Sequence, residues 1–239
     1  QVTNVNIPYG TFTTITAIST DTIFWYDVPI GGNEIATGDS YTTPFLYATK
    51  VYYPEARAGG QGGIITIGNG TQTQNYIPSY GWYDYSWGAT IYLASEIAAS
   101  GSLDSIAYYI NNNINFPMIN QNIYVAHTTD NYFMNSNKPD PSTMTQVFSG
   151  NITWTGPGWF KIPLQTGFSY NGTDNLLIYW ENHDGDYTSG YPNYRHTPTT
   201  GNLAKYAYQD VSFPSGSGTL TTNRPNIRLS LVSISTGCP

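Results

Sequence analysis

Turn-forming residues interrupt this chain roughly every 8 to 15 residues, and the segments between them are short and rich in apolar and aromatic side chains. Residues 158–164 show the pattern clearly, because Phe160, Ile162 and Leu164 alternate with Trp159 and Lys161. A repeat of two residues is that of a strand with one buried face. A helix is expected only over residues 96–100. The 239-residue chain is therefore predicted to be all β.

The composition narrows the class of protein further. Tyr (22 residues) and Trp (6) are abundant beside Thr, Ser, Asn and Gly, which is typical of an extracellular β protein. The net charge is −7, so few side chains could neutralise a row of phosphates and no nucleic acid is expected as a partner. No apolar run approaches 18 residues, so no membrane insertion is expected. The single cysteine, Cys238, excludes an intrachain disulfide, and its role stays open.

The spacing of these segments predicts two domains and a joint. Residues 1–57 hold four or five short strands around Trp25 and are expected to form a small immunoglobulin-like domain. Residues 58–88 form a joint that is Gly-rich at its start and aromatic towards its end. Residues 89–239 hold about nine or ten further strands and are expected to form a larger, jelly-roll-like antiparallel β-sandwich.

The first domain resembles the short immunoglobulin-like repeats of large surface proteins exported by the type nine secretion route. The resemblance is carried by Phe24-Trp25-Tyr26-Asp27, Pro29, Gly31-Gly32, Ala36-Thr37-Gly38, Tyr41-Thr42-Thr43-Pro44 and Val51-Tyr52-Tyr53. It implies a spacer or adhesive module at the cell surface or secreted, and no enzyme. Residues 235–239 look like the edge of another such repeat, which implies one unit of a longer array.

The rest of the chain, over most of residues 70–234, resembles a β-sandwich domain of the same exported proteins. The matching positions are Ile91-Tyr92, Ser95-Glu96-Ile97, Ile123-Tyr124, His127-Thr128, Val147-Phe148-Ser149-Gly150, Gly158-Trp159, Phe168-Ser169-Tyr170-Asn171-Gly172 and Asn175-Leu176. This resemblance implies location and architecture more than activity.

An acidic loop follows the apolar run 176–180, which reads as a buried strand. Its oxygen ligands are Glu181, Asn182, Asp184 and Asp186. Calcium takes six to eight oxygens, and this segment supplies some of them, so calcium binding is one interpretation. The other is a solvated loop in which Asn and Asp form turns. The three histidines have no zinc-site spacing.

Aromatic residues on either side of this loop suggest glycan binding, because a sugar ring has an apolar face and a rim of hydroxyls. The candidate ligand-binding residues are Trp82, Tyr83, Tyr85 and Trp87 in the joint, and Tyr187, Tyr191, Tyr194 and Arg195 after the loop. The alternative is that these rings pack in the core, which is the commoner fate of such a dense aromatic segment.

Nothing in the chain marks a catalytic site. The GxSxG motif is absent, and the few carboxylates lie next to turns, so no enzymatic activity is expected. The expected function is therefore a non-enzymatic extracellular module for adhesion or glycan binding. One alternative is a filament or stalk subunit that joins copies of itself by strand addition, since the first domain looks short for a complete sandwich. Another is an accessory domain of a secreted hydrolase.

Overall fold

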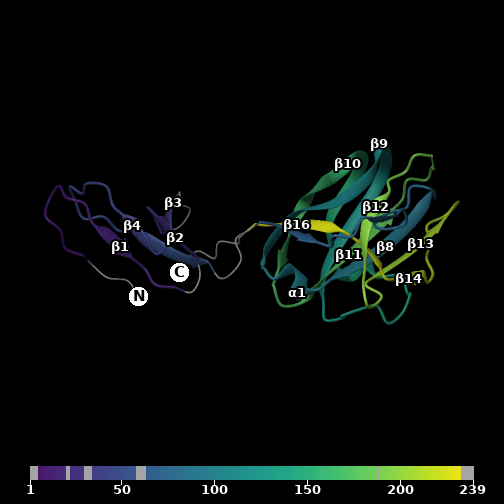
Figure 1. Ribbon diagram of the computed structural model, residues 1–239. Helices are drawn as coiled ribbons and strands as arrows, with labels where there is room; N and C mark the ends of the chain where they lie inside the picture. The colour runs from purple at the N-terminus through teal and green to yellow at the C-terminus, as the bar shows by residue number, and fades with distance from the viewer. Residues whose placement is uncertain (1–4, 20–21, 30–33, 58–62, 188, 233–239) are drawn as a thin grey trace. The chain divides into compact units, whose positions relative to one another are not determined.

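The computed structural model describes residues 5–19, 22–29, 34–57, 63–187 and 189–232 (Figure 1). It confirms an all-β protein with a small immunoglobulin-like domain and a large antiparallel β-sandwich. The chain divides into two compact units, with a boundary after residue 60. The small unit is described within residues 5–57, and the large unit within residues 63–232.

The small unit contains two sheets among its described residues. Strands β1 (Thr14–Thr16) and β4 (Ser40–Thr42) form one, and β3 (Glu34–Thr37), β2 (Thr22–Tyr26) and β5 (Tyr53–Arg57) form the other. Alternate residues of β2, Ile23 and Trp25, point inward and are almost fully buried. The indole Nε1 of Trp25 donates to the carbonyl of Gly38 at 2.8 Å. This unit therefore has a narrow core built on a single strand.

The large unit is organised around one long hairpin, β9 (Gly101–Thr128) and β10 (Thr145–Tyr170). Four register shifts, such as the one between Gly156 and Gly158, interrupt the pairing of these two strands. Such bulges bend a strand, so the hairpin can contribute to both layers of the sandwich, as the curled sheet in Figure 1 shows. In β9, Asn111-Asn112-Asn113 is a sequence typical of a polar turn, which predicts two shorter strands, but here these residues continue a single strand.

Nine further strands complete the sheet of the large unit. They are β6 (Ile64–Ile67), β7 (Gln72–Gln74), β8 (Tyr85–Tyr92), β11 (Asn175–Asn182), β12 (Tyr194–Pro198), β13 (Ala204–Gln209), β14 (Thr219–Thr221), β15 (Asn223–Pro225) and β16 (Ile227–Val232). Strand β11 lies between β8 and β9, which confirms residues 176–180 as a central strand. The helix predicted over 96–100 is found earlier in the chain, as α1 (Ala94–Ile97), and ends where Ala98 adopts a left-handed conformation. A 3-10 turn, η1 (Pro141–Thr143), precedes β10.

Aromatic residues fill the core of the large unit. The rings of Trp154 and Trp180 stack with their centres 5.6 Å apart, and Tyr194 meets Trp154 edge-on at 5.3 Å. Tyr108 contacts all three of these rings. Burying such large apolar side chains is the main favourable term for a β-sandwich.

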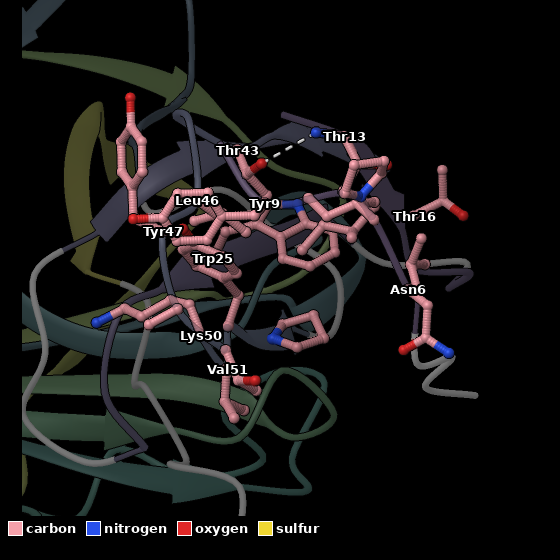
Figure 2. A pocket seen from close by; sticks show the side chains of 18 residues that line it. Asn6, Tyr9, Thr13, Thr16, Trp25, Thr43, Leu46, Tyr47, Lys50 and Val51 are labelled. Carbon is pink, nitrogen blue, oxygen red and sulfur yellow. Dashed lines mark hydrogen bonds between the residues drawn. The ribbon is translucent and has the colours of Figure 1, made fainter. Parts of the chain in front are cut away.

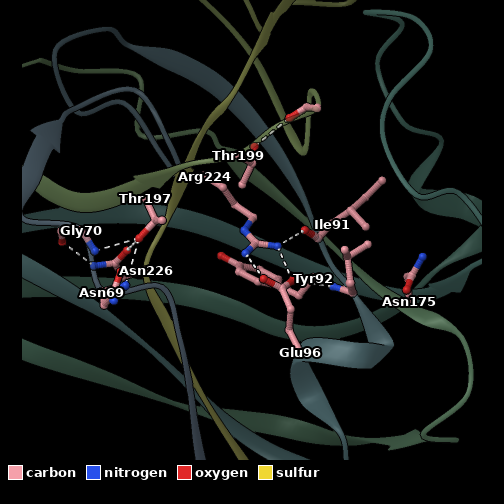
Figure 3. Close-up of polar contacts among 12 residues, drawn as sticks. Asn69, Gly70, Ile91, Tyr92, Glu96, Asn175, Thr197, Thr199, Arg224 and Asn226 are labelled. Atoms are coloured by element: carbon pink, nitrogen blue, oxygen red, sulfur yellow. Dashed lines mark hydrogen bonds and ion pairs between the residues drawn. The ribbon is translucent and has the colours of Figure 1, made fainter.

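An ion pair between a buried arginine and a partly exposed glutamate ties α1 to the sheet (Figure 3). The Arg224 guanidinium, only 3% exposed, donates to both carboxylate oxygens of Glu96 at 2.7 and 2.6 Å and to the carbonyl of Ile91 at 3.1 Å. The same group lies 4.8 Å from the centre of the Tyr92 ring. This bidentate geometry supplies partners for a charge that would otherwise be costly to bury.

The stretch 64–88, assigned to a joint from its composition, belongs to the large unit. β6 pairs with β16, and β7 pairs with β12. Asn226 fastens the loop between β6 and β7 by donating to the carbonyl of Gly70 at 2.8 Å, as Figure 3 shows. The Gly-rich residues 58–62, like residues 235–239 with Cys238, lie outside the described residues.

The first and last strands of the large unit are neighbours. Ser230 of β16 pairs with Ile64 of β6, and the amide of Leu231 donates to the carbonyl of Gly63 at 3.1 Å. The chain therefore begins and ends this unit at the same place. In the described part of the chain, no helix is long and apolar enough to cross a membrane.

Candidate functional site

Eight aromatic rings form a connected group in the large unit, which we call the aromatic surface cluster. The ring centres of successive members lie 4.2 to 6.3 Å apart. In order of contact the members are Tyr187, Trp82, Tyr191, Tyr80, Tyr83, Tyr208, Tyr206 and Tyr76. Exposed fractions are highest for Tyr187 (57%), Trp82 (42%) and Tyr208 (41%). The cluster thus opens to solvent over several rings.

Three segments that are distant in sequence bring these rings together. The loop between β7 and β8 supplies Tyr76 to Tyr83, the segment between β11 and β12 supplies Tyr187 and Tyr191, and β13 supplies Tyr206 and Tyr208. The pairing of β13 with β8 places Tyr208 opposite Ser86. A side chain could not replace Gly81, because a Cβ there would lie 2.7 Å from the Phe116 ring. Close packing of this glycine seats the loop on the sheet.

The structure brings together half of the predicted ligand-binding residues. Trp82, Tyr83, Tyr187 and Tyr191 are members of the cluster. Tyr85 is half-buried, and its hydroxyl lies beside Gly185.

The other three predicted residues lie elsewhere. Trp87 and Tyr194 are fully buried, so neither offers a stacking face to a ligand. Both stand on strands of the core, where Trp87 packs near Tyr179 and Tyr194 packs against Trp154. Arg195 stacks on the ring of Tyr109 at 4.0 Å.

Half of the cluster is not among the residues predicted from the sequence: Tyr76, Tyr80, Tyr206 and Tyr208. Tyr206 and Tyr208 occupy alternate positions of β13 and therefore face the same side of the sheet. That spacing was a signal in the sequence. What the sequence did not show is that β13 would lie beside β8.

Carboxylates border the cluster. The Asp84 amide donates to Oδ1 of Asp210, and the Val211 amide donates to Oδ2 of Asp84, both at 3.4 Å. Partial burial raises the pKa of Tyr83, and the neighbouring Tyr208 and Asp210 raise it further. The pKa of Tyr80 is raised by burial and by three nearby tyrosines. These phenols therefore stay protonated at neutral pH, when they can donate or accept hydrogen bonds.

The four predicted calcium ligands do not converge. Glu181 and Asn182 are consecutive residues of β11, so their side chains point to opposite faces. Asn182 Oδ1 accepts from Gln121 Nε2 at 2.6 Å and from the Asp184 amide at 3.1 Å. Asp186 Oδ1 accepts from the next amide. Within the described ranges, no group of three or more His, Cys, Asp and Glu residues could hold a metal ion.

Glu181 instead takes part in a buried polar network. It accepts hydrogen bonds from the hydroxyl of Tyr179 at 2.9 Å, and it lies 3.2 Å from His183 Nε2 and 3.8 Å from Lys138 Nζ. Burial disfavours its charge, but the hydrogen bonds with His183 and Tyr179 outweigh burial and lower its pKa. The pKa of Asp184, in contrast, is raised by burial and by the nearby Asp186 and Asp84.

The small unit has an open pocket of about 590 Å³ beside its core. Figure 2 shows Trp25 at its centre, with Tyr9, Tyr47 and Val51 around it. These three side chains are 81%, 64% and 56% exposed. The lining is mixed, because Asn6, Thr13 and Lys50 stand beside these apolar side chains.

The comparisons with known proteins concern the small unit alone. No curated protein and no solved structure matches the chain significantly. A family model described as "Ig-like domain CHU_C associated" matches residues 1–63, about a quarter of the chain. The small unit is therefore similar to an Ig-like domain linked to type nine secretion, which points to an extracellular or surface protein.

Proposed function

We propose that this protein is a non-enzymatic surface module that binds a neutral polysaccharide through the aromatic surface cluster. The observation that carries the proposal is the run of eight rings in mutual contact, three of them more than 40% exposed. Large exposed apolar patches on soluble proteins are rare and mark ligand or partner surfaces.

The chemistry of the cluster matches that of a sugar chain. The apolar face of a pyranose packs on an aromatic ring, and its hydroxyls need hydrogen-bonding groups at the edge of that ring. Tyrosine provides both, at a low cost in side-chain entropy. Several rings in a row suit successive sugars better than one isolated sugar.

The carboxylates at the border favour a neutral sugar. Asp84 and Asp210 lie beside Tyr83, and Asp186 precedes the exposed Tyr187. Carboxylates accept hydrogen bonds from sugar hydroxyls and repel a uronate or a sulfate.

Native affinity electrophoresis tests this proposal with neutral polysaccharides such as xylan, mannan, glucan and dextran. We expect at least one of these polysaccharides to retard the wild-type protein. Trp82→Ala should weaken this retardation about tenfold, because the stacking of one ring on an aromatic side chain contributes about 1–3 kcal/mol. Tyr132→Ala is the matched control, because Tyr132 is 48% exposed but lies outside the cluster. Migration unaffected by every neutral polysaccharide, or an unchanged Trp82→Ala variant, would contradict the proposal.

A second candidate function is assembly by strand addition, which the pocket of the small unit favours. Each described strand of the large unit already pairs within its own sheet, so none of these strands is free to be added to the small unit. The occupant we propose is an extended segment of a second copy of the chain, which would pair with the small unit by strand addition.

Sedimentation velocity over a wide concentration range tests this second candidate. We expect concentration-dependent oligomers that Val51→Glu abolishes, because Val51 lines the pocket and is 56% exposed. Met134→Glu is the control, since Met134 is 76% exposed on the large unit. A monomer at every concentration would rule out assembly between copies.

A further inference from the structure

A second patch lies on the sheet of the large unit, over β9, β10, β12 and β16. Two arginines and two aromatic rings alternate across it. Arg195 lies 4.0 Å from the centre of the Tyr109 ring, Tyr109 meets Trp159 edge-on at 5.5 Å, and Arg228 lies 4.3 Å from the centre of the Trp159 ring. We call this group, with Lys161, the cationic patch.

The strand register explains how these side chains meet. Ala107 of β9 pairs with Lys161 of β10 on one side and with Arg228 of β16 on the other. Paired residues point to the same face of a sheet, so both cations flank a methyl group. The small side chain of Ala107 lets Arg228 reach across β9 to Trp159, which pairs with Tyr109.

Among the residues that the structure describes, the cations of this patch have no acidic partner. None of Arg195, Arg228 and Lys161 forms an ion pair with a described residue. The arginines use Nε to donate to neutral oxygens, that of Asn111 at 2.9 Å and that of Thr66 at 3.3 Å. Their terminal amino groups have no described hydrogen-bond partner in the chain.

The local charge is opposite to that of the whole protein. The chain carries 8 basic and 15 acidic residues. The strands β6, β9, β10, β12 and β16 carry three cations, all in this patch, and a single acid, Asp104. At physiological ionic strength charges interact over roughly 8 Å, so the patch itself, and not the net charge, decides what binds there.

We propose that the cationic patch binds an acidic polysaccharide, one that carries carboxylate or sulfate groups. Planar guanidinium groups held against aromatic rings are oriented in advance, and their free amino groups match the two oxygens of a carboxylate or sulfate. The rings of Tyr109 and Trp159 hold the two guanidinium groups in place at this surface. Three cations are too few to follow a nucleic acid backbone, where several phosphates must be neutralised together.

Affinity electrophoresis and titration calorimetry test this proposal with polygalacturonate, dextran sulfate, neutral dextran and single-stranded DNA as probes. We expect at least one acidic polysaccharide to bind in low salt and to be released by about 0.5 M NaCl, where the Debye length is below 8 Å. The triple variant Lys161→Gln, Arg195→Gln, Arg228→Gln is expected to bind about tenfold more weakly or worse. Lys50→Gln removes one cation from the small unit and should leave binding unchanged.

Two further variants distinguish an effect on binding from an effect on the stability of the fold. The side chain of Lys161 is exposed, so Lys161→Gln alone should weaken binding about two- to threefold with an unchanged melting curve. Arg195→Lys with Arg228→Lys keeps the charge but loses the planar stack, and should bind between wild type and the triple variant.

Three results would overturn the proposal: no binding of either acidic polysaccharide, equal binding by the triple variant, or DNA binding as tight as that of the acidic polysaccharides. Because the patch shares no residue with the aromatic surface cluster, Trp82→Ala should leave acidic polysaccharide binding intact. Failure of the neutral polysaccharide experiment is thereby distinguishable from failure of this one.

Discussion

The two units differ in what surrounds their buried tryptophans. In the large unit Trp87, Trp154 and Trp180 are at most 1% exposed; Trp154 and Trp180 lie in one buried hydrophobic cluster and Trp87 in another. In the small unit Trp25 is also buried, at 2%, but it borders an open pocket. The difference teaches that a buried indole does not by itself make a closed core. Closure depends on how many strands are available to cover it.

The comparison predicts its largest effect in the large unit. Trp154→Ala should lower the free energy of unfolding by about 4 kcal/mol, because the cavity it leaves has fixed walls on all sides. Urea denaturation followed by circular dichroism measures this. Trp82→Ala is the control, with an expected cost under about 0.5 kcal/mol, since that ring is 42% exposed. Equal costs would show that the core is not packed as described.

The second effect concerns the ion pair in the same unit. Glu96→Ala should cost about 3 kcal/mol, because it leaves the Arg224 guanidinium buried without a carboxylate. Asp104→Ala, which removes an exposed acid, is the control. A cost below about 1 kcal/mol would mean that water reaches Arg224 in solution.

The third prediction probes the small unit. Trp25→Ala should cost only about 2 kcal/mol, because water in the neighbouring pocket can fill the space, so that the transfer term dominates. Thermal denaturation of this variant beside Trp154→Ala makes the comparison direct. If Trp25→Ala costs as much as Trp154→Ala, the pocket is covered in solution, which would favour the strand-addition proposal.

The fourth effect is a pH dependence in the large unit. Burial lowers the pKa of Lys205 to about 8, from 10.5 in the unfolded chain. Between these values the unfolded state binds more protons, so stability rises with pH. From pH 7.5 to 9.5 the wild type should gain about 1–2 kcal/mol relative to Lys205→Met, since that difference cancels the tyrosine titrations shared by both proteins. Parallel pH profiles would contradict a buried, protonated Lys205.

The smallest effect tests the metal interpretation. Because Glu181 and Asn182 point to opposite faces, removing calcium with EDTA should shift the melting temperature by less than about 1 °C. Scanning calorimetry with and without excess calcium measures this. A shift of several degrees would show that other oxygen ligands hold an ion at this loop.

Local patterns predicted the fold class, the immunoglobulin-like start and the central strand at 176–180. Such features depend on residues close in sequence, namely alternation, turn residues and short motifs. The length of β9 could not be predicted, because Asn111-Asn112-Asn113 is a sequence typical of turns. Pairing with distant strands holds these residues in a strand instead.

The candidate site was only half predictable for a related reason. Trp82 and Trp87 stand in one aromatic segment, and alternation does not separate them because β8 is buried on both faces. Tyr206 and Tyr208 join the cluster through pairing between β13 and β8, which lie more than 100 residues apart. A local sequence pattern predicts neither the exposure of a single indole nor the pairing of strands that are distant in sequence.

The neighbouring positions of β6 and β16 also determine how the large unit responds to mechanical force. These antiparallel strands pair from Ile64 with Ser230 to Ile67 with Ile227, and the chain continues from the same end of both. Tension on those two ends loads the hydrogen bonds one after another, as in a zipper, and not all together in shear. In a surface protein under tension, the pairing of β6 with β16 would therefore separate first and at low force. The chain released in this way would lengthen the protein before force reaches the ligand contacts.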